Sequence, residues 1–144
     1  MSDLTTARGL DLFAGTGALG FELASRGAQH VTLVEHNQRL ADRLQQLQRK
    51  LAADRIQVVA ADALVAASRW PDASFDVIFV DPPYDSALLQ PALRTAARLI
   101  APDGLIYVEH RDPIDESLID TCGLQLVRAS RAGRVFFYLL RRKA

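Results

Sequence analysis

The chain has 144 residues, of which 49% are hydrophobic and 24% are charged, and its 17 basic residues balance its 17 acidic residues. This composition is typical of one globular domain with a substantial core, here residues 1–144, and it excludes nucleic-acid binding through an overall basic excess. The single cysteine excludes a disulfide framework, and no apolar run is long enough to cross a membrane. We therefore expect a cytoplasmic protein with no membrane partner.

Short apolar segments rich in β-branched residues alternate along the chain with segments of helical periodicity. In chain order this pattern predicts a strand at 9–13, a helix at 18–26, a strand at 30–35, a helix at 38–53, a strand at 56–60, a helix at 63–69, a strand at 75–81, a helix at 87–100, a strand at 105–110, a helix at 114–120, and strands at 124–130 and 134–141. Such alternation is typical of an α/β fold with a mostly parallel sheet, here of seven strands. Because only residues 131–133 separate the last two strands, we expect a hairpin whose final strand runs antiparallel to the rest.

A glycine-rich turn follows the first predicted strand. Gly15, Gly17 and Gly20 have G-x-G-x-x-G spacing before a helix, where the backbone can approach a ligand closely. Glu35 ends the second strand and is placed to accept hydrogen bonds from both hydroxyls of a ribose. These features suit a nicotinamide dinucleotide as well as S-adenosylmethionine.

Two further acids favour S-adenosylmethionine. Asp11 lies inside the first strand, where a carboxylate would repel a pyrophosphate but attract the α-ammonium group of S-adenosylmethionine. Asp62 follows the third strand, with Ala63 beside it, and is placed to accept a hydrogen bond from an adenine amine. The alternative is that Asp11 is a hydrogen-bonded strand-end acid and Asp62 a helix cap.

A second candidate site follows the strand in FDVIFVDPPYDS. Pro82 and Pro83 prevent further ladder pairing directly after Asp81. The Asp81 carboxylate and the Pro82 carbonyl can accept the two N–H groups of a base amine and direct its lone pair toward an electrophilic methyl group. Tyr84 offers a ring on which a flipped base can stack. In the usual strand order this segment lies beside the cofactor, although a strand end with a polar turn remains the simpler alternative.

Four segments, LDLFAGTGALGFELASRGA, VTLVEHN, FDVIFVDPPY and GLIYVEH, in this order resemble the bacterial RsmD family, as does the closing AGRVFFYLLRR. The resemblance implies a Rossmann-like class I S-adenosylmethionine-dependent methyltransferase that modifies the N2 amine of a guanine in small-subunit ribosomal RNA. It implies a cofactor loop at 13–20 and a catalytic motif formed by Asp81, Pro82, Pro83 and Tyr84. The expected cofactor-binding residues are Asp11, Phe13, Ala14, Gly15, Thr16, Gly17, Gly20, Glu35, His36, Asp62 and Ala63.

Three arginines are candidates for RNA phosphate contacts. Arg131 and Arg134 flank the last hairpin turn, and Arg111 follows the fifth strand, so all three are expected at the cofactor edge of the sheet. For each of them, a solvated surface arginine is the alternative. The three histidines lack metal-ligand spacing, so we expect no metal site, and we read His36 as a neighbour of the cofactor.

Other functions remain open. A DNA adenine N6-methyltransferase shares the D-P-P-Y motif, but the 66 residues from Gly15 to Asp81 leave no room for a target-recognition domain. A nicotinamide-dependent oxidoreductase would leave Asp11 and residues 81–84 unexplained. Relatives carry a longer segment before the first strand, so a truncated cofactor-binding domain with little activity is the third alternative. For the leading function we expect a monomer that acts on ribosomal RNA, either free or in the assembling subunit.

Overall fold

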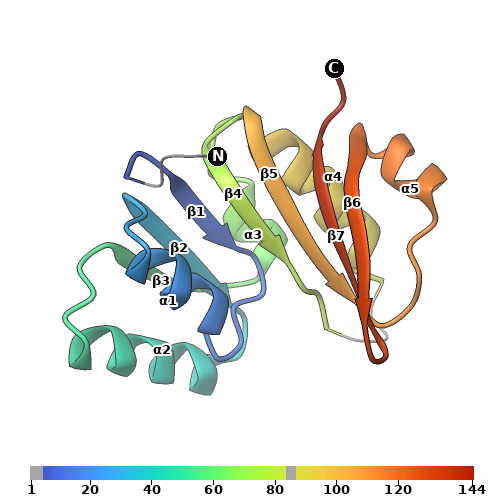
Figure 1. The fold of residues 1–144 in the computed structure, drawn as a ribbon. Coiled ribbons are helices and arrows are strands. Elements are labelled where there is room, and N and C mark those ends of the chain that lie inside the picture. Colours follow the sequence, from blue (N-terminus) through green and yellow to red (C-terminus); the bar gives the residue numbers. More distant parts are fainter. Residues whose placement is uncertain (1–4, 84–86) are drawn as a thin grey trace.

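A seven-stranded sheet with the strand order β3-β2-β1-β4-β5-β7-β6 forms the centre of the computed structural model, which describes residues 5–83 and 87–144 (Figure 1). The strands are β1 (Arg8–Asp11), β2 (His30–Glu35), β3 (Ile56–Ala60), β4 (Phe75–Val80), β5 (Ile100–His110), β6 (Leu124–Ala132) and β7 (Val135–Arg142). The helices are α1 (Ala18–Ser25), α2 (Gln38–Lys50), α3 (Ala63–Ala67), α4 (Leu89–Leu99) and α5 (Glu116–Thr121).

The strand directions confirm the predicted mostly parallel sheet. Strand β1 pairs in parallel with β2 and β4, and β4 pairs in parallel with β5. Strand β7 runs antiparallel to both β5 and β6, as the short hairpin connection predicted. Strand β6 therefore points the same way as β5, and the β6–β7 turn lies at the edge where the parallel strands end (Figure 1).

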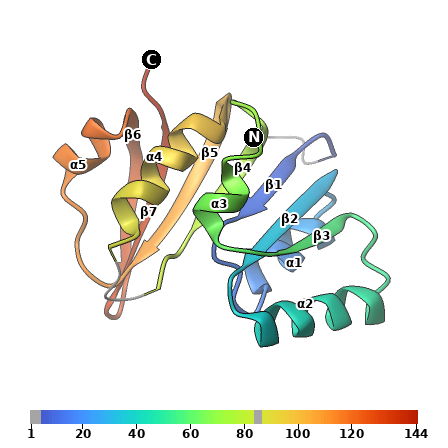
Figure 2. The same ribbon diagram turned by 180° about the vertical axis from the view of Figure 1, so that it is seen from behind.

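The helices cover the two faces of the sheet unequally. Helices α1 and α2 lie beside β1, β2 and β3 on one face, whereas α3, α4 and α5 lie on the other (Figures 1 and 2). Across residues 5–83 and 87–144, no helix covers the α1 side of β5, β7 and β6. None of the helices in this part of the chain combines the length and the apolar character needed to cross a bilayer.

One row of fully buried side chains shows where the main core lies. Leu10, Ile78, Ile106 and Leu140 pair in register across β1, β4, β5 and β7, and each is 0% exposed. Residues adjacent to these in each strand point to the opposite face, because side chains alternate along a strand. The core row thus faces α3 and α4, and the alternate row faces the side of α1.

Strand β5 begins earlier than the sequence predicted. We expected a helix to residue 100 and a strand that begins at residue 105, whereas the structure continues β5 from Ile100 through Pro102 and Gly104. Pro102 is tolerated because the β4–β5 pairing is irregular at this point, where Phe75 pairs with Ile100 and Val77 with Leu105. A Cβ atom at Gly104 would lie 2.7 Å from the Asp76 carbonyl oxygen, so the close backbone approach requires glycine.

Candidate active site

A cavity of about 760 Å³ lies where the parallel strands end. The loop after β1 and the segment after β4 both line it, because β1 and β4 are neighbours and the Leu12 N–H donates to the Phe79 carbonyl. The predicted site residues in the lining are Phe13, Gly15, Glu35, His36, Asp62, Ala63, Asp81, Pro82, Pro83 and Arg111. Tyr84 lies outside the described residues.

Glu35 holds the glycine-rich turn in place. Its Oε1 accepts a hydrogen bond from the Gly15 N–H at 2.8 Å, and its Oε2 accepts one from the Asn37 N–H, also at 2.8 Å. Each carboxylate oxygen can accept a second hydrogen bond, so Glu35 retains acceptor capacity toward the cavity. Gly15 has φ +57°, and a Cβ atom there would meet no atom within 4 Å, so the turn opens onto empty space.

The other two glycines of the motif serve helix packing. A Cβ atom at Gly20 would lie 2.2 Å from Leu33 of β2, and one at Gly17 would lie 2.5 Å from Leu44 of α2. Neither glycine lines the cavity, and the same holds for the buried Ala14 and the exposed Thr16. The predicted contact of these four residues with the cofactor therefore stays a prediction. The absence of a side chain at Gly17 and Gly20 lets α1 pack closely against α2 and β2.

Asp11 is buried behind the cavity lining. Asp11 is only 3% exposed, and its Oδ1 accepts a hydrogen bond from the Phe13 N–H at 3.2 Å. The pKa of Asp11 is raised to about 7, chiefly by burial and also by the negative charges of Asp81, Glu35 and Glu109, whereas the hydrogen bond from Phe13 opposes the shift. Asp11 is therefore a hydrogen-bonded acid at the end of a strand, as the alternative interpretation expected. The surrounding carboxylates make this region strongly negative, so it attracts a cation.

Asp62 acts as the helix cap that the alternative interpretation described. Its Oδ1 accepts hydrogen bonds from the N–H groups of Leu64 and Val65, at 3.0 and 3.1 Å, at the start of α3. Asp62 and Ala63 also line the cavity. The cap and the predicted adenine contact are compatible, because a carboxylate has two oxygens and the cap uses only Oδ1.

The acid at the end of β4 is paired with a second acid that sequence reasoning missed. Glu109 of β5 lies beside Asp81, and the two side chains interact. The pKa of Glu109 is raised to about 6, first by burial and then by its interaction with the Asp81 carboxyl group. The strand order could have predicted that Asp81 and Glu109 are neighbours, because Val80 pairs with Val108 and the two strands end side by side.

Several other residues in the lining were not predicted. Most are apolar or lie next to a predicted residue; they are Leu12, Asn37, Leu40, Leu88, Glu109, His110 and Val135. Val135 belongs to β7, so the last hairpin borders the cavity, as expected from the parallel direction of β6.

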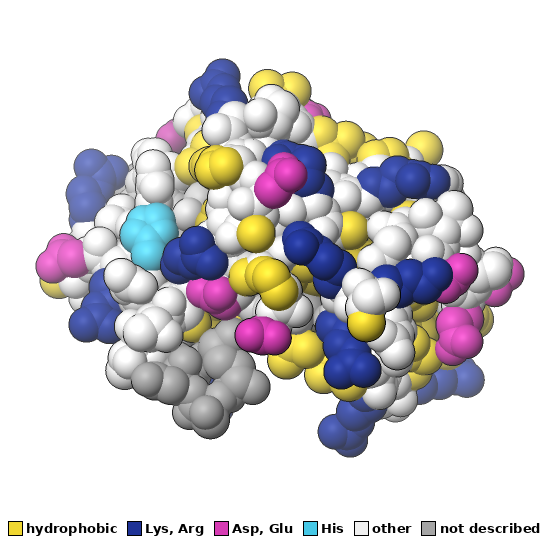
Figure 3. Space-filling model, turned by 90° about the horizontal axis from the view of Figure 1, so that it is seen from above, with side chains coloured by type: hydrophobic (Ala, Val, Ile, Leu, Met, Phe, Trp, Pro, Cys, Tyr) yellow, Lys and Arg dark blue, Asp and Glu magenta, His cyan; other side chains and the backbone are white. Residues whose placement is uncertain are grey.

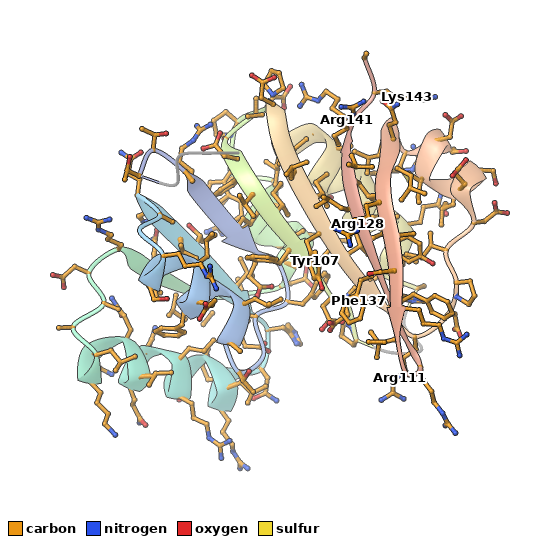
Figure 4. All side chains as sticks on the ribbon, viewed as in Figure 1. Tyr107, Arg111, Arg128, Phe137, Arg141 and Lys143 are labelled. Atoms are coloured by element: carbon orange, nitrogen blue, oxygen red, sulfur yellow. The ribbon has the colours of Figure 1, made fainter. Side chains whose placement is uncertain are left out.

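The three predicted RNA-contacting arginines occupy different environments. Arg111 lines the cavity and lies beside the β6–β7 turn (Figure 4). Arg131 is held by its own turn, because its Nε donates to the Gly133 carbonyl at 2.8 Å and its guanidinium lies 5.2 Å from the centre of the Phe136 ring. Arg134 is exposed beside the cavity residue Val135. All three therefore lie at the cavity edge of the sheet, and their contact with RNA stays a prediction.

Comparison with known proteins adds independent information. The family model described as "Conserved hypothetical protein 95" matches residues 1–141. The chain is 34% identical over 137 residues to the ribosomal RNA small subunit methyltransferase D of Haemophilus influenzae, which covers 90% of this chain and 69% of that protein. It is 32% identical over 146 residues to the protein of the same name from Escherichia coli K12, with 98% and 71% covered.

Solved structures share the fold. The Escherichia coli protein yhhF superposes with a TM-score of 0.83 at 31% identity, covering 98% of this chain and 78% of that one. A SAM dependent methyltransferase from Aquifex aeolicus superposes with a TM-score of 0.75 at 15% identity, covering 96% of this chain and 84% of that one, which shows likeness of fold alone.

Proposed function

Because the chain belongs to the RsmD family, described as "Conserved hypothetical protein 95", we propose that it transfers a methyl group from S-adenosylmethionine to the N2 amine of a guanine in small-subunit ribosomal RNA. Relatives from Haemophilus influenzae and Escherichia coli are named for methylation of small-subunit ribosomal RNA. The observation that carries the proposal is one cavity shared by the turn after β1 and the Asp81–Pro82 segment after β4. A ribosomal RNA substrate implies that the protein acts in the cytoplasm.

The cofactor is S-adenosylmethionine, and the residues of the cavity fit it. When bound, this cofactor supplies an electrophilic methyl group on a positively charged sulfonium. Glu35 can accept hydrogen bonds from a ribose diol through the acceptor sites that Gly15 and Asn37 leave open. Asp62 lies in the lining at the start of α3, and the carboxylate oxygen that the helix cap leaves open could accept a hydrogen bond from an adenine amine. The carboxylates that raise the pKa of Asp11 also give the cavity the negative charge that a cationic ligand requires.

The residues after β4 would bind and orient the accepting amine. The Asp81 carboxylate and the Pro82 carbonyl accept its two N–H groups, and proline fixes the backbone φ that directs this carbonyl. Two acceptors on one nitrogen draw it toward tetrahedral geometry and expose its lone pair, so alignment and electrostatics supply most of the rate enhancement. Glu109 lies beside Asp81 and adds negative charge next to the proposed position of the amine.

The test measures transfer of a labelled methyl group from S-adenosylmethionine to unmodified 16S ribosomal RNA and, separately, to assembled small subunits. Digestion to nucleosides should place the label in N2-methylguanosine, with no transfer by Asp81→Ala. Asp103→Ala is the matched control, because Asp103 is an exposed acid in β5 outside the cavity lining. Label in N6-methyladenine would contradict the guanine target. Absence of label from both RNA substrates, with cofactor binding intact by calorimetry, would contradict the proposed activity.

A further inference from the structure

The order of the strands divides the cavity into two sides. Gly15, Glu35 and Asp62, the proposed cofactor contacts, lie at the ends of β1, β2 and β3, on one side of β4. Glu109 belongs to β5, on the other side of β4, and Asp81 at the end of β4 lies between the two groups. Neighbouring strands are about 4.8 Å apart, so Glu109 lies one strand further from the cofactor side than Asp81. Glu109 is therefore placed to meet the accepting base.

Glu109 and Asp81 reach the cavity from matching positions of two parallel strands. Val80 of β4 pairs with Val108 of β5, and both valines are 0% exposed in the core. The residue after each valine points to the opposite face of the sheet, because side chains alternate along a strand. Asp81 and Glu109 therefore share one face, where both line the cavity and their side chains interact. Together they form a pair of adjacent carboxyl groups that we call the acid pair.

The acid pair lies in a cavity dominated by carboxylates. Among the described residues of the lining, Glu35, Asp62, Asp81 and Glu109 are acidic, whereas Arg111 carries a permanent positive charge. The opposite end of the sheet, seen from above in Figure 3, carries many Lys and Arg side chains. The negative charge is therefore concentrated at the cavity end, where it favours ligands that donate hydrogen bonds.

An ionised acid pair can only accept hydrogen bonds. The pKa of Glu109 is raised to about 6, so its carboxyl group is mostly ionised at neutral pH, and an ionised carboxylate has no proton to donate. Two carboxylates side by side repel each other, and a ligand that donates to both reduces that repulsion. The acid pair therefore fits a base with two N–H donor groups next to each other.

Guanine is the RNA base that meets this requirement. Its Watson–Crick edge places the N1–H directly beside the N2 amine, and enzymes that extrude a base read it along this edge. Adenine and cytosine carry their amine beside a ring nitrogen that only accepts hydrogen bonds, and uracil has no amine. A ring nitrogen that faces a carboxylate is repelled and leaves the carboxylate without a partner, which is costly in a buried site.

We propose that Glu109 selects guanine by accepting a hydrogen bond from the N1–H of the target base, while Asp81 and Pro82 hold its N2 amine. This assignment rests on the proposed function. It gives the two members of the acid pair different tasks, because Asp81 orients the amine that is methylated and Glu109 reads the neighbouring ring nitrogen. Adenine would present its N1 lone pair to Glu109, so the same contact that favours guanine disfavours adenine.

The test compares two RNA substrates. Labelled RNA fragments locate the methylated guanosine, and a second RNA carries 2-aminopurine there, which keeps the 2-amine and lacks the N1–H. The ratio of kcat/KM for guanine to that for 2-aminopurine should fall by about 10- to 100-fold in Glu109→Ala, the equivalent of one charged hydrogen bond. Glu109→Gln should keep part of the ratio, because its amide oxygen can still accept from N1–H. The matched control is Glu116→Ala, which should keep the whole ratio, because Glu116 is an exposed acid of α5 outside the described lining.

The outcomes separate this inference from the proposed function. An unchanged ratio in Glu109→Ala, or an equal loss of rate with both RNAs, would overturn the inference while guanine methylation stands. If the wild type transfers no methyl group, NMR titration with GMP and with 1-methyl-GMP, in the presence of S-adenosylhomocysteine, decides the matter. Tighter binding of GMP that Glu109→Ala abolishes would support the role of Glu109 and contradict the proposed function, whereas no preference for GMP in the wild type would overturn both. Each variant is compared with itself on two ligands, so a partial loss of folded protein does not change the ratio.

Discussion

Replacing Asp11 by asparagine is expected to stabilise the folded chain at alkaline pH. Asp11 is 3% exposed, and its pKa is raised from 3.8 to about 7, chiefly by burial. The folded chain therefore binds this proton more tightly than the unfolded chain, and its stability falls as the pH rises from about 4 to 7. Asparagine cannot ionise, and its Oδ1 can still accept the hydrogen bond from the Phe13 N–H.

The size of the expected stabilisation follows from the pKa shift of Asp11. Each pKa unit corresponds to about 1.4 kcal/mol, so ionising Asp11 in the folded state costs about 4 kcal/mol once the pH exceeds 7. At pH 5 the cost is only about 1.5 kcal/mol, because the folded state is still protonated while the unfolded state is mostly ionised. Asp11→Asn should therefore raise the free energy of unfolding by about 4 kcal/mol at pH 8 and by much less at pH 5.

Urea unfolding of both proteins at pH 5, 6, 7 and 8, followed by circular dichroism, measures this difference. A gain that is the same at every pH, or a loss of stability at pH 8, would refute the argument that buried charge on Asp11 destabilises the fold. Cofactor affinity by calorimetry should fall in the same variant, because the cavity loses one negative charge. A variant that is both more stable and weaker in binding would identify Asp11 as a residue retained for function.

Four further predictions concern the cavity and the glycine turn. Glu35→Ala should weaken cofactor binding by about 1–3 kcal/mol through lost charged hydrogen bonds, and unaltered affinity by calorimetry would show that the ribose lies elsewhere. Asp81→Ala should abolish methyl transfer while cofactor affinity stays within about tenfold; unchanged turnover would remove its role in binding the amine. Glu109 gains a negative charge as the pH rises through about 6, so cofactor affinity should rise there in the wild type, and Glu109→Gln should lose that rise; identical pH profiles of affinity would contradict this assignment. Gly20→Ala should lower the free energy of unfolding by about 1–3 kcal/mol, because its Cβ atom would lie 2.2 Å from the buried Leu33; a urea midpoint equal to that of the wild type would contradict the packing role.

Local patterns in the sequence were sufficient to predict most of the strands of the sheet. The predicted bounds of β2 and β3 agree with the structure, and the antiparallel direction of β7 followed from a connection of three residues. The start of β5 could not be predicted, since Pro102 and Gly104 are typical of a turn. In the structure, pairing with β4 overrides that local preference.

The glycine motif shows why a spacing can be correct while the role of each residue stays open. Gly15 lines the cavity and is favoured by its positive φ, whereas a Cβ atom at Gly20 would clash with Leu33. The sequence records only that glycine occupies both positions. Which of the two reasons applies at each position depends on how the turn and α1 sit against β2.

The sequence by itself determined the α/β class, the direction of the strands and the residues that gather where the strands end, because periodicity and strand order are local or follow from short connections. The tertiary structure alone decided two features, the position of Glu109 beside Asp81 and the side of β5 and β7 that no helix within residues 5–83 and 87–144 covers. Apolar residues on both sides of a strand predict burial on both faces, and only the placement of the described helices shows that none of them covers one side of β5 and β7.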